Sequence, residues 1–300
     1  MKQIRISNLF QLASLLMVAF SFSACQKEIS ASSELEAITT EEVTVNQSTS
    51  ETEFDDVFNI TMGMGNETGE DLGIVGGISI FGNRQGDTYI EQVDSAVNSR
   101  CFTVTVTPRD RGVFPKTVTL DFGNGCKARD GKLRKGKIIT VFTGPMGIPG
   151  SKATTTFDGY KVDSIAVAGT HTVTNTSTSN NRIFSVSVAD GKLTWDGGRW
   201  VNWSCTRNMT QIEGNGTPIL PADDIFTITG SGRGENSRGN TWAHQITEPL
   251  VKRFTCRWIS KGIISITRNA GSGQLDFGDG SCDNKAVLTI NGVSKEILLR

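Results

Sequence analysis

Polar and apolar residues alternate along most of the chain after residue 70, which is the pattern of a β-strand with one buried face. The stretch KTVTLDF places Val118, Leu120 and Phe122 on one face and polar residues on the other. The same alternation recurs in CFTVTVTP, KIITVF, YKVDSIAVAGTHTV, RIFSVSV, KLTWDGGRWVNW, DIFTITG, GIISITR and AVLTING. No long helical pattern interrupts these segments, and turn signals separate them at roughly 8–12-residue spacing, as in antiparallel all-β proteins.

This pattern predicts an all-β domain over residues 71–300, built as an antiparallel meander, a β-sandwich or a rolled sheet. Asp-Gly pairs in ARDGK, VADGK and TWDGGRW suit tight hairpin turns, because glycine accepts a positive φ. Glycines inside predicted strands, as in AVAGTHTV and TITGSGRG, indicate bulges and favour a strongly curved sheet. The domain is either one large unit or two similar halves, about 71–180 and 181–300.

The region before the strands has a different composition. Residues 28–56 contain nine acidic residues and no Lys or Arg, together with many Ser and Thr. Such a segment cannot bury enough apolar surface to fold alone, so residues 25–50 are predicted to be a disordered acidic tether. In TEFDDVFNITM, apolar residues recur at helical spacing from Phe54 onward, which predicts a short amphipathic helix and a linker within residues 51–70.

The first 24 residues have the features of a signal peptide. Lys2 and Arg5 precede an apolar run from Leu12 to Phe22, which is too short to span a bilayer. The sequence FSAC that ends at Cys25 resembles a bacterial lipobox, and the resemblance implies that Cys25 carries acyl chains of the palmitate type. The alternative is ordinary secretory cleavage without a lipid.

A lipid on Cys25 implies attachment to the bacterial envelope, because several acyl chains together anchor a soluble domain stably. The residues CQKE resemble the short charged tag that directs lipoproteins of the Bacteroidota to the cell surface. The resemblance implies the outer membrane, with the cell surface as the expected side and the periplasmic leaflet as the alternative.

A longer resemblance covers most of residues 95–300. The ordered series FPKTVTLDFGNGC, DGKLRKGKIIT, TFDGYKVDSIAVAGTHTVTN and LDFGDGSCDNKAVLTING resembles an uncharacterised family of Bacteroidota envelope lipoproteins. That family has no assigned activity. The resemblance therefore implies an envelope lipoprotein and carries no reaction with it.

Four cysteines of the β region are spaced as two similar pairs, and export to the envelope permits disulfides. Cys101 and Cys126 are 25 positions apart, and Cys256 and Cys282 are 26 apart. The midpoint of each pair falls in or beside a predicted turn, so each pair lies at the open end of a predicted hairpin. We therefore predict the disulfides Cys101–Cys126 and Cys256–Cys282.

The second cysteine of each pair closes a repeated phrase, LDFGNGC and LDFGDGSC. Asp121 and Asp276 lie opposite the apolar face and are predicted to accept hydrogen bonds from amides of the turn. A calcium site in the second copy is the alternative, with Asp276, Asp279 and Asp283 as weak candidates for oxygen ligands. No other metal or cofactor is predicted.

Charge is distributed unevenly. Residues 28–83 hold 12 acidic and no basic residues, whereas residues 84–300 hold 27 basic and 19 acidic ones. The densest basic cluster contains Lys132, Arg134 and Lys135, and it indicates either an anionic ligand such as an acidic glycan or a solvated face that also meets the acidic tether. No nucleic-acid-binding module is visible, so nucleic acid is not an expected partner.

Candidate catalytic residues are few. His171 and His244 lie outside any HExxH motif, and no GxSxG elbow is present. Each histidine is therefore predicted to be a strand residue with a local hydrogen bond. Cys205 is predicted to be a buried strand thiol, with a nucleophilic role as the alternative.

Two tryptophans offer a different kind of site. Trp200 and Trp203 follow the DGG turn on opposite faces of a predicted strand, so that an exposed one would supply a sugar-stacking platform. The alternative is core packing. The sequence thus predicts a lipid-anchored envelope protein with a non-enzymatic binding or structural role, whose partner is a glycan or another envelope protein. An envelope hydrolase is the less favoured alternative.

Overall fold

The computed structural model describes residues 31–62, 101–110, 112–127, 131–215, 223–253, 255–269 and 271–299. The predicted signal peptide, Cys25 and residues 71–100 of the predicted β domain lie outside these ranges. Residues from Glu36 onward belong to one compact unit.

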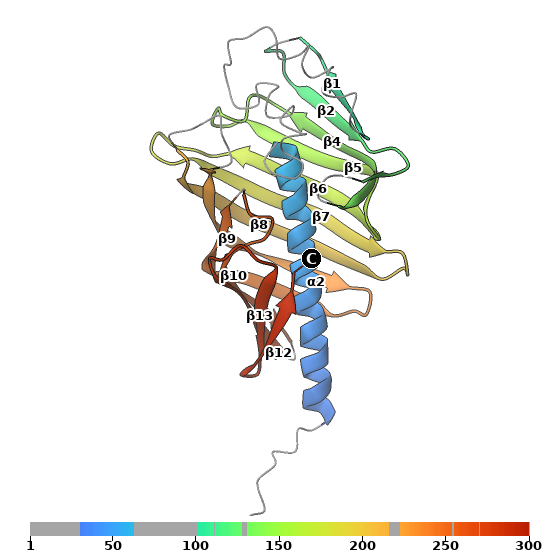
Figure 1. Ribbon diagram of the computed structural model, residues 1–300, viewed down its shortest axis with the longest axis vertical. Helices are drawn as coiled ribbons and strands as arrows, with labels where there is room; N and C mark the ends of the chain where they lie inside the picture. Colours follow the sequence, from blue (N-terminus) through green and yellow to red (C-terminus); the bar gives the residue numbers. More distant parts are fainter. Residues whose placement is uncertain are drawn as a thin grey trace, which may run out of the picture. The chain divides into compact units, whose positions relative to one another are not determined.

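The described strands form a single antiparallel sheet (Figure 1). They are β1 (Thr103–Thr107), β2 (Lys116–Asp121), β3 (Cys126–Lys127), β4 (Leu133–Phe142), β5 (Lys152–Val162), β6 (Ile165–Asn175), β7 (Ile183–Trp195), β8 (Trp200–Glu213), β9 (Ile225–Asn236), β10 (Thr241–Arg253), β11 (Lys261–Arg268), β12 (Gly271–Asp279), β13 (Lys285–Ile290) and β14 (Val293–Leu298). Apart from the two-residue β3, which pairs with β4, each strand pairs with the next along the chain. The sheet is therefore a meander.

This architecture confirms the prediction of an all-β antiparallel fold. It selects the meander, because the described strands lie in one sheet rather than in the two sheets of a sandwich. The sheet also continues without a break from β6 into β7 across residue 180, where the two predicted halves would meet, and the buried residues on either side belong to one core cluster. Whether the two parts are similar halves stays a prediction.

Burial along the strands follows the alternation that the sequence predicts. Val118, Leu120 and Phe122 are each 3% exposed, as expected for one buried face. Strand β8 alternates in the same way over most of its length. Since a shift of one residue would move every side chain to the other face, the register of these long strands is strongly specified.

Glycines within the strands mark irregularities of the ladder, as predicted. The register shifts between Lys135 and Lys137, and Gly136 at that point has a φ of +71°. A Cβ atom on Gly136 would lie 2.3 Å from the carbonyl oxygen of Gly159 on the neighbouring strand, so no other residue fits. A similar shift between β6 and β7 occurs at Gly169, whose φ is +114°. Such bulges bend a strand and increase its twist.

The helix α2 (Ala31–Met62) is the main difference from the prediction. The sequence predicts a disordered tether over residues 25–50 and a short helix within residues 51–70, but residues 31–62 form one continuous helix. The tether prediction is therefore wrong from residue 31 onward. The prediction rested on the composition of the segment alone. The segment is helical because it packs against the sheet, where Val43, Phe54 and Phe58 are buried.

The helix keeps its shape although Thr, Ser and β-branched residues are weak helix formers. Several of its hydroxyl groups donate hydrogen bonds to the carbonyl oxygen four residues earlier: Thr40, Thr44, Thr49, Ser50 and Thr52. These local bonds satisfy hydroxyls that would otherwise be buried without a partner. The helix can therefore be buried against the sheet while carrying few apolar side chains.

Candidate functional site

The helix crosses several strands on one face of the sheet, which we call the inner face (Figure 1). Near the C-terminal end of the helix, the hydroxyl oxygens of Thr61 and Thr155 on β5 lie 3.2 Å apart. Toward its other end, Arg268 Nη1 on β11 donates to Thr40 Oγ1 at 3.1 Å. The opposite, or outer, face of the sheet carries the alternate side chains of the same strands.

Acidic residues of the helix pair with basic residues of the inner face. Arg134, on β4, is fully buried and its Nη2 lies 2.8 Å from Asp56 Oδ2. Lys132 Nζ lies 3.6 Å from the same Asp56 oxygen and 3.8 Å from Glu53 Oε2. Two further carboxylates, those of Glu51 and Asp55, lie within the same six helical positions. Four carboxylates of the helix thus face cations of the sheet.

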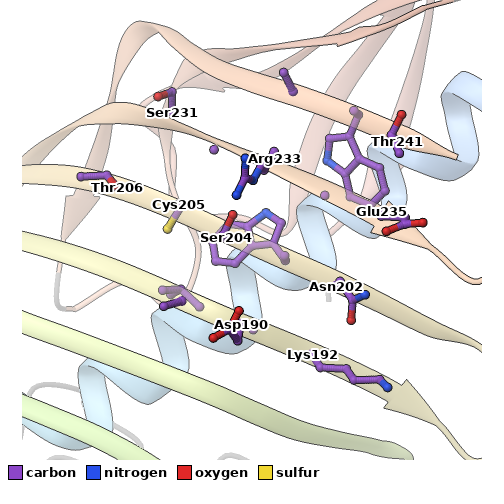
Figure 2. Close-up of a pocket in the computed structure, with 18 of the residues that line it drawn as sticks. Asp190, Lys192, Asn202, Ser204, Cys205, Thr206, Ser231, Arg233, Glu235 and Thr241 are labelled. Carbon is purple, nitrogen blue, oxygen red and sulfur yellow. The ribbon is translucent and has the colours of Figure 1, made fainter.

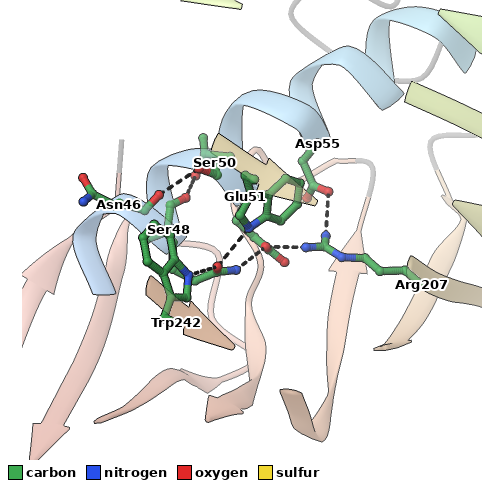
Figure 3. Close-up of polar contacts among 10 residues, drawn as sticks. Asn46, Ser48, Ser50, Glu51, Asp55, Arg207 and Trp242 are labelled. Atoms are coloured by element: carbon green, nitrogen blue, oxygen red, sulfur yellow. Dashed lines mark hydrogen bonds and ion pairs between the residues drawn. The ribbon is translucent and has the colours of Figure 1, made fainter. Parts of the chain in front are cut away.

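Arg207 on β8 completes this ionic interface (Figure 3). It forms an ion pair with Glu51, and its Nη1 lies 3.8 Å from Asp55 Oδ1. The side chains of Arg207 and Glu51 are only 6% and 3% exposed. A buried charge of this kind needs its partner, because the surrounding protein solvates it far less well than water does.

Burial and pairing shift the pKa values of these carboxyl groups in opposite directions. Burial alone would raise the pKa of Asp56, but Lys132 and Arg134 together hold it below its usual value. For Glu51 burial outweighs the neighbouring Arg207 and raises the pKa to about 7. Glu51 is therefore the carboxyl of this interface that titrates near neutral pH.

Gln47 joins two tryptophans of the sheet to the same network. The indole Nε1 groups of Trp203 on β8 and Trp242 on β10 donate to Gln47 Oε1 at 2.9 and 3.0 Å. The amide Nε2 of Gln47 in turn donates to Glu51 Oε2 at 3.0 Å. The network fixes the rotation of the helix about its own axis, because one side chain must meet both indoles.

The structure separates the predicted basic cluster into two parts. Lys132 and Arg134 point to the inner face and contact the acidic helix, whereas Lys135 is exposed. Contact between this cluster and the acidic N-terminal segment was one of the two sequence interpretations, and it is confirmed for Lys132 and Arg134. An external anionic ligand on these two residues is not compatible with their burial under the helix.

The two predicted sugar-binding tryptophans also lie on different faces. Trp203 is 2% exposed, because its ring stacks between Phe54 of the helix and His244 of β10. It belongs to the core, and its assignment as an exposed platform is wrong. Trp200 remains half-buried on the outer face, where Lys192 Nζ lies 5.6 Å from its ring centre.

The outer face of β7 to β10 contains an open depression with a volume of about 1210 Å³ (Figure 2). We call it the outer depression. Its exposed lining is polar and includes Asp190, Lys192, Asn202, Thr206, Ser231, Arg233, Glu235 and Thr241. Trp200 is not among the lining residues, but Lys192, which lies over its ring, is one of them. Hydroxyl, amide and charged groups of both signs thus share one accessible surface.

Histidine and cysteine chemistry is suppressed at the inner face. Burial lowers the pKa of His171 and of His244 to about 3, so both rings are neutral. His244 has no hydrogen-bond partner for either ring nitrogen among the described residues, so its predicted local hydrogen bond is wrong. The free Cys205 is buried, as predicted, and burial raises its pKa to about 11. A thiol in this state is a poor nucleophile.

The aspartates of the repeated phrase serve their own turns. Asp121 Oδ1 accepts from the amide of Gly123, and Asp276 Oδ1 accepts from that of Gly278, both at 2.8 Å. Both hydrogen bonds were predicted. Asp279 likewise accepts from the amide of Ser281 at 3.0 Å. Within the described ranges no three acidic, His or Cys side chains gather into a metal-binding group, so the calcium candidates Asp276, Asp279 and Asp283 remain separate.

The structure pairs the cysteines as the spacing predicts. The Cα atoms of Cys101 and Cys126 are 5.2 Å apart, and those of Cys256 and Cys282 are 5.7 Å apart. The second pair closes the hairpin of β11 and β12, whose turn follows Arg268. Both pairs therefore hold hairpins near the ends of the described sheet.

Sequence reasoning missed Gln47, Glu51 and Arg207. Gln47 falls in the predicted tether and Glu51 in the predicted short helix, and neither was singled out as a contact. The signal for a contact was the uneven distribution of charge, because residues 28–83 hold no basic residue and residues 84–300 hold 27 basic against 19 acidic ones. No pattern in the sequence shows which strand cation meets which carboxylate, since that depends on sheet curvature.

No protein family, curated protein or solved structure matches this chain. Across the described part of the chain, no helix combines the length and apolar character needed to cross a membrane.

Proposed function

We propose that this chain is an exported, lipid-anchored envelope protein with a non-enzymatic binding role, and that the outer depression binds a polar ligand of the glycan class. The observation that carries this proposal is the outer depression itself. It is open, it is lined by hydroxyl, amide and charged side chains, and one of its lining residues, Lys192, lies against the half-buried ring of Trp200. Polar groups that fix orientation beside an aromatic face are the usual elements of such sites.

The charges of the outer depression favour a neutral or mixed-charge glycan over a strongly acidic one. Asp190 and Lys192 line one side, and Arg233 and Glu235 line the other. Positive and negative groups are thus interspersed, whereas a site for a polyanion would concentrate positive charge. Of the basic cluster that the sequence offered for an acidic glycan, Lys132 and Arg134 are engaged with the helix.

The state of the reactive groups supports a role without catalysis. His171 and His244 are neutral and buried, and Cys205 is a buried thiol with a raised pKa. Glu51, whose pKa suits a general acid or base, is buried between its own helix and the sheet and is paired with Arg207. Of these groups only the buried thiol of Cys205 is among the residues that line the outer depression, whereas His171, His244 and Glu51 are not.

Trp200→Ala should abolish binding to a glycan array that the wild-type protein binds, because the substitution removes the half-buried ring beside Lys192 on which a sugar would stack. Trp195→Ala is the matched control, since Trp195 packs against the core and stacks with Arg199 at the neighbouring turn. This control should keep the wild-type binding pattern. A wild-type protein that binds no glycan on the array, or equal binding by both variants, would contradict the proposed ligand class.

The anchor has a separate test. Cys25→Ser should abolish incorporation of labelled palmitate and move the protein from the membrane fraction to the soluble fraction. Cys205→Ala is the control, because the buried Cys205 should not accept a lipid. Palmitate labelling that survives Cys25→Ser would place the lipid elsewhere and refute this anchor.

A further inference from the structure

The helix and the sheet are distant from each other in the sequence. Helix α2 ends at Met62 and β1 begins at Thr103, so the 40 residues from 63 to 102 connect them. A chain of that length reaches up to about 130 Å when extended, at roughly 3.3 Å per residue. The covalent connection alone therefore does not determine which copy of the sheet a given helix occupies.

Non-covalent contacts determine the pairing of helix and sheet instead. The sheet presents Lys132, Arg134 and Arg207 at fixed positions, and the helix supplies carboxylates in the matching order. Gln47 must at the same time meet the indoles of Trp203 and Trp242. An identical helix from a second copy satisfies every one of these contacts, whereas an unrelated acidic helix would have to reproduce the whole arrangement.

Each part depends on the other for its stability. A helix with this content of Thr, Ser and Val is unstable on its own in water, because helices in proteins gain most of their stability from packing against the rest of the fold. Without a helix, the inner face would expose the rings of Trp203 and Trp242 and several buried cations. Both parts therefore need a partner, and the partner need not come from the same chain.

The interface is also less completely satisfied than a typical core. Asn46 Nδ2, His171 Nδ1 and Arg207 Nε are buried without a hydrogen-bond partner among the described residues. Each such atom lowers the net stability of the docked helix by a fraction of its desolvation cost. A docked helix of this kind can leave and return more readily than one in a fully satisfied core.

From these observations we propose that the inner face of one copy accepts the helix Glu36–Met62 of a second copy, so that two chains exchange helices and form a dimer. The interface within each half is then the one described above, with only the origin of the helix changed. Exchange of identical elements is a low-cost route to dimers, because it creates few new contacts. A high concentration of the protein favours exchange over binding of the chain's own helix, because the linker gives the chain's own helix an effective concentration that a second copy must match. The inference does not depend on the lipid anchor or on the glycan ligand.

One exposed ion pair reports where the helix sits. Lys295 Nζ on β14 lies 2.6 Å from Glu41 Oε1 on the helix, and the two side chains are 61% and 42% exposed. Thiols at these two positions would be within reach of a short bismaleimide. The native cysteines would not compete, because four are paired, Cys205 is buried and Cys25 is replaced by Ser in the soluble chain.

The test mixes two full-length soluble proteins, one with Glu41→Cys and one with Lys295→Cys, unfolds them together in urea with disulfides intact, refolds them and adds the bismaleimide. Exchange should give a cross-linked species of twice the monomer mass on a denaturing gel. A single chain with both substitutions should give an internally cross-linked monomer in dilute solution.

A second ion pair provides the matched control. Lys161 Nζ on β5 lies 2.7 Å from Asp196 Oδ1 beyond β7, and both side chains are exposed. Neither residue of this pair lies on the helix, so mixed Lys161→Cys and Asp196→Cys chains should not be cross-linked to each other. The proposal is overturned if the helix–sheet mixture gives no cross-link between chains, if the control mixture is cross-linked between chains to the same extent, or if the doubly substituted chain does not cross-link at all.

Discussion

Replacing Arg207 with Met is expected to lower the free energy of unfolding by about 3–5 kcal/mol, which is the usual cost of removing one partner from a buried ion pair. The substitution leaves the Glu51 carboxyl almost fully buried and without its ion pair to Arg207. Denaturant unfolding of the soluble protein, monitored by tryptophan fluorescence, measures this loss. Lys161→Met is the control, because its pair with Asp196 is exposed and should contribute little.

The double variant Glu51→Met with Arg207→Met distinguishes a missing partner from a general packing defect. Replacing both charges with apolar groups of similar size should recover most of the lost free energy, because the buried Glu51 charge is removed with its partner and only the more exposed Asp55 loses Arg207. A double variant that is as unstable as Arg207→Met alone would show that the guanidinium stabilises the fold through other contacts.

The pH dependence of stability gives the same pair a second readout. Burial raises the pKa of Glu51 from 4.5 to about 7, so between these pH values the folded protein holds a proton that the unfolded chain has released. The contribution of Glu51 to the free energy of unfolding therefore falls as the pH rises through this window, by at most about 1.4 kcal/mol per pH unit. Arg207→Met should extend the fall to higher pH, because Arg207 lowers the pKa of Glu51.

Removing the C-terminal disulfide should have the second large effect. Cys256→Ser with Cys282→Ser opens a loop with a separation of 26 residues, which costs about 3.5 kcal/mol in the chain-entropy treatment. Denaturant unfolding again measures the change. Cys101→Ser with Cys126→Ser is the matched comparison, because its separation of 25 residues predicts nearly the same loss.

The comparison of the two double variants also shows what each hairpin contributes. If the Cys256 and Cys282 variant lost less than about 1 kcal/mol, the pairing of β11 with β12 would already restrict the unfolded loop, and the chain-entropy treatment would fail here. Thiol titration of the soluble Cys25→Ser chain, unfolded with both disulfides intact, should find one reactive cysteine, which is Cys205.

Local patterns in the sequence predict the sheet well. Alternation places Val118, Leu120 and Phe122 correctly, because side chains on successive residues of a strand must point to opposite faces. The cysteine pairs follow from hairpin geometry, which depends only on nearby residues. Asp121 and Asp276 behave as predicted for the same reason, since each accepts a bond from an amide two residues away.

Features that depend on distant contacts could not be predicted in this way. Composition favours disorder for residues 31–50, and only the sheet makes them a helix, by supplying cations and apolar surface from far along the chain. Alternation likewise puts Trp200 and Trp203 on opposite faces but does not say which face is buried. The helix decides that question, because Phe54 covers Trp203.

The long-range contacts of the helix mean that the chain does not become structured in the order in which it is synthesised. The helical segment is synthesised before the strands, yet Arg268, which donates a hydrogen bond to Thr40, is 228 residues later in the chain. Lys295, which pairs with Glu41, is 254 residues later. Contacts at such separations form slowly, because the intervening chain must first be brought together. The segment that is synthesised first thus acquires its final surroundings last, and a chain truncated before β14 would leave Glu41 of the helix without its partner Lys295.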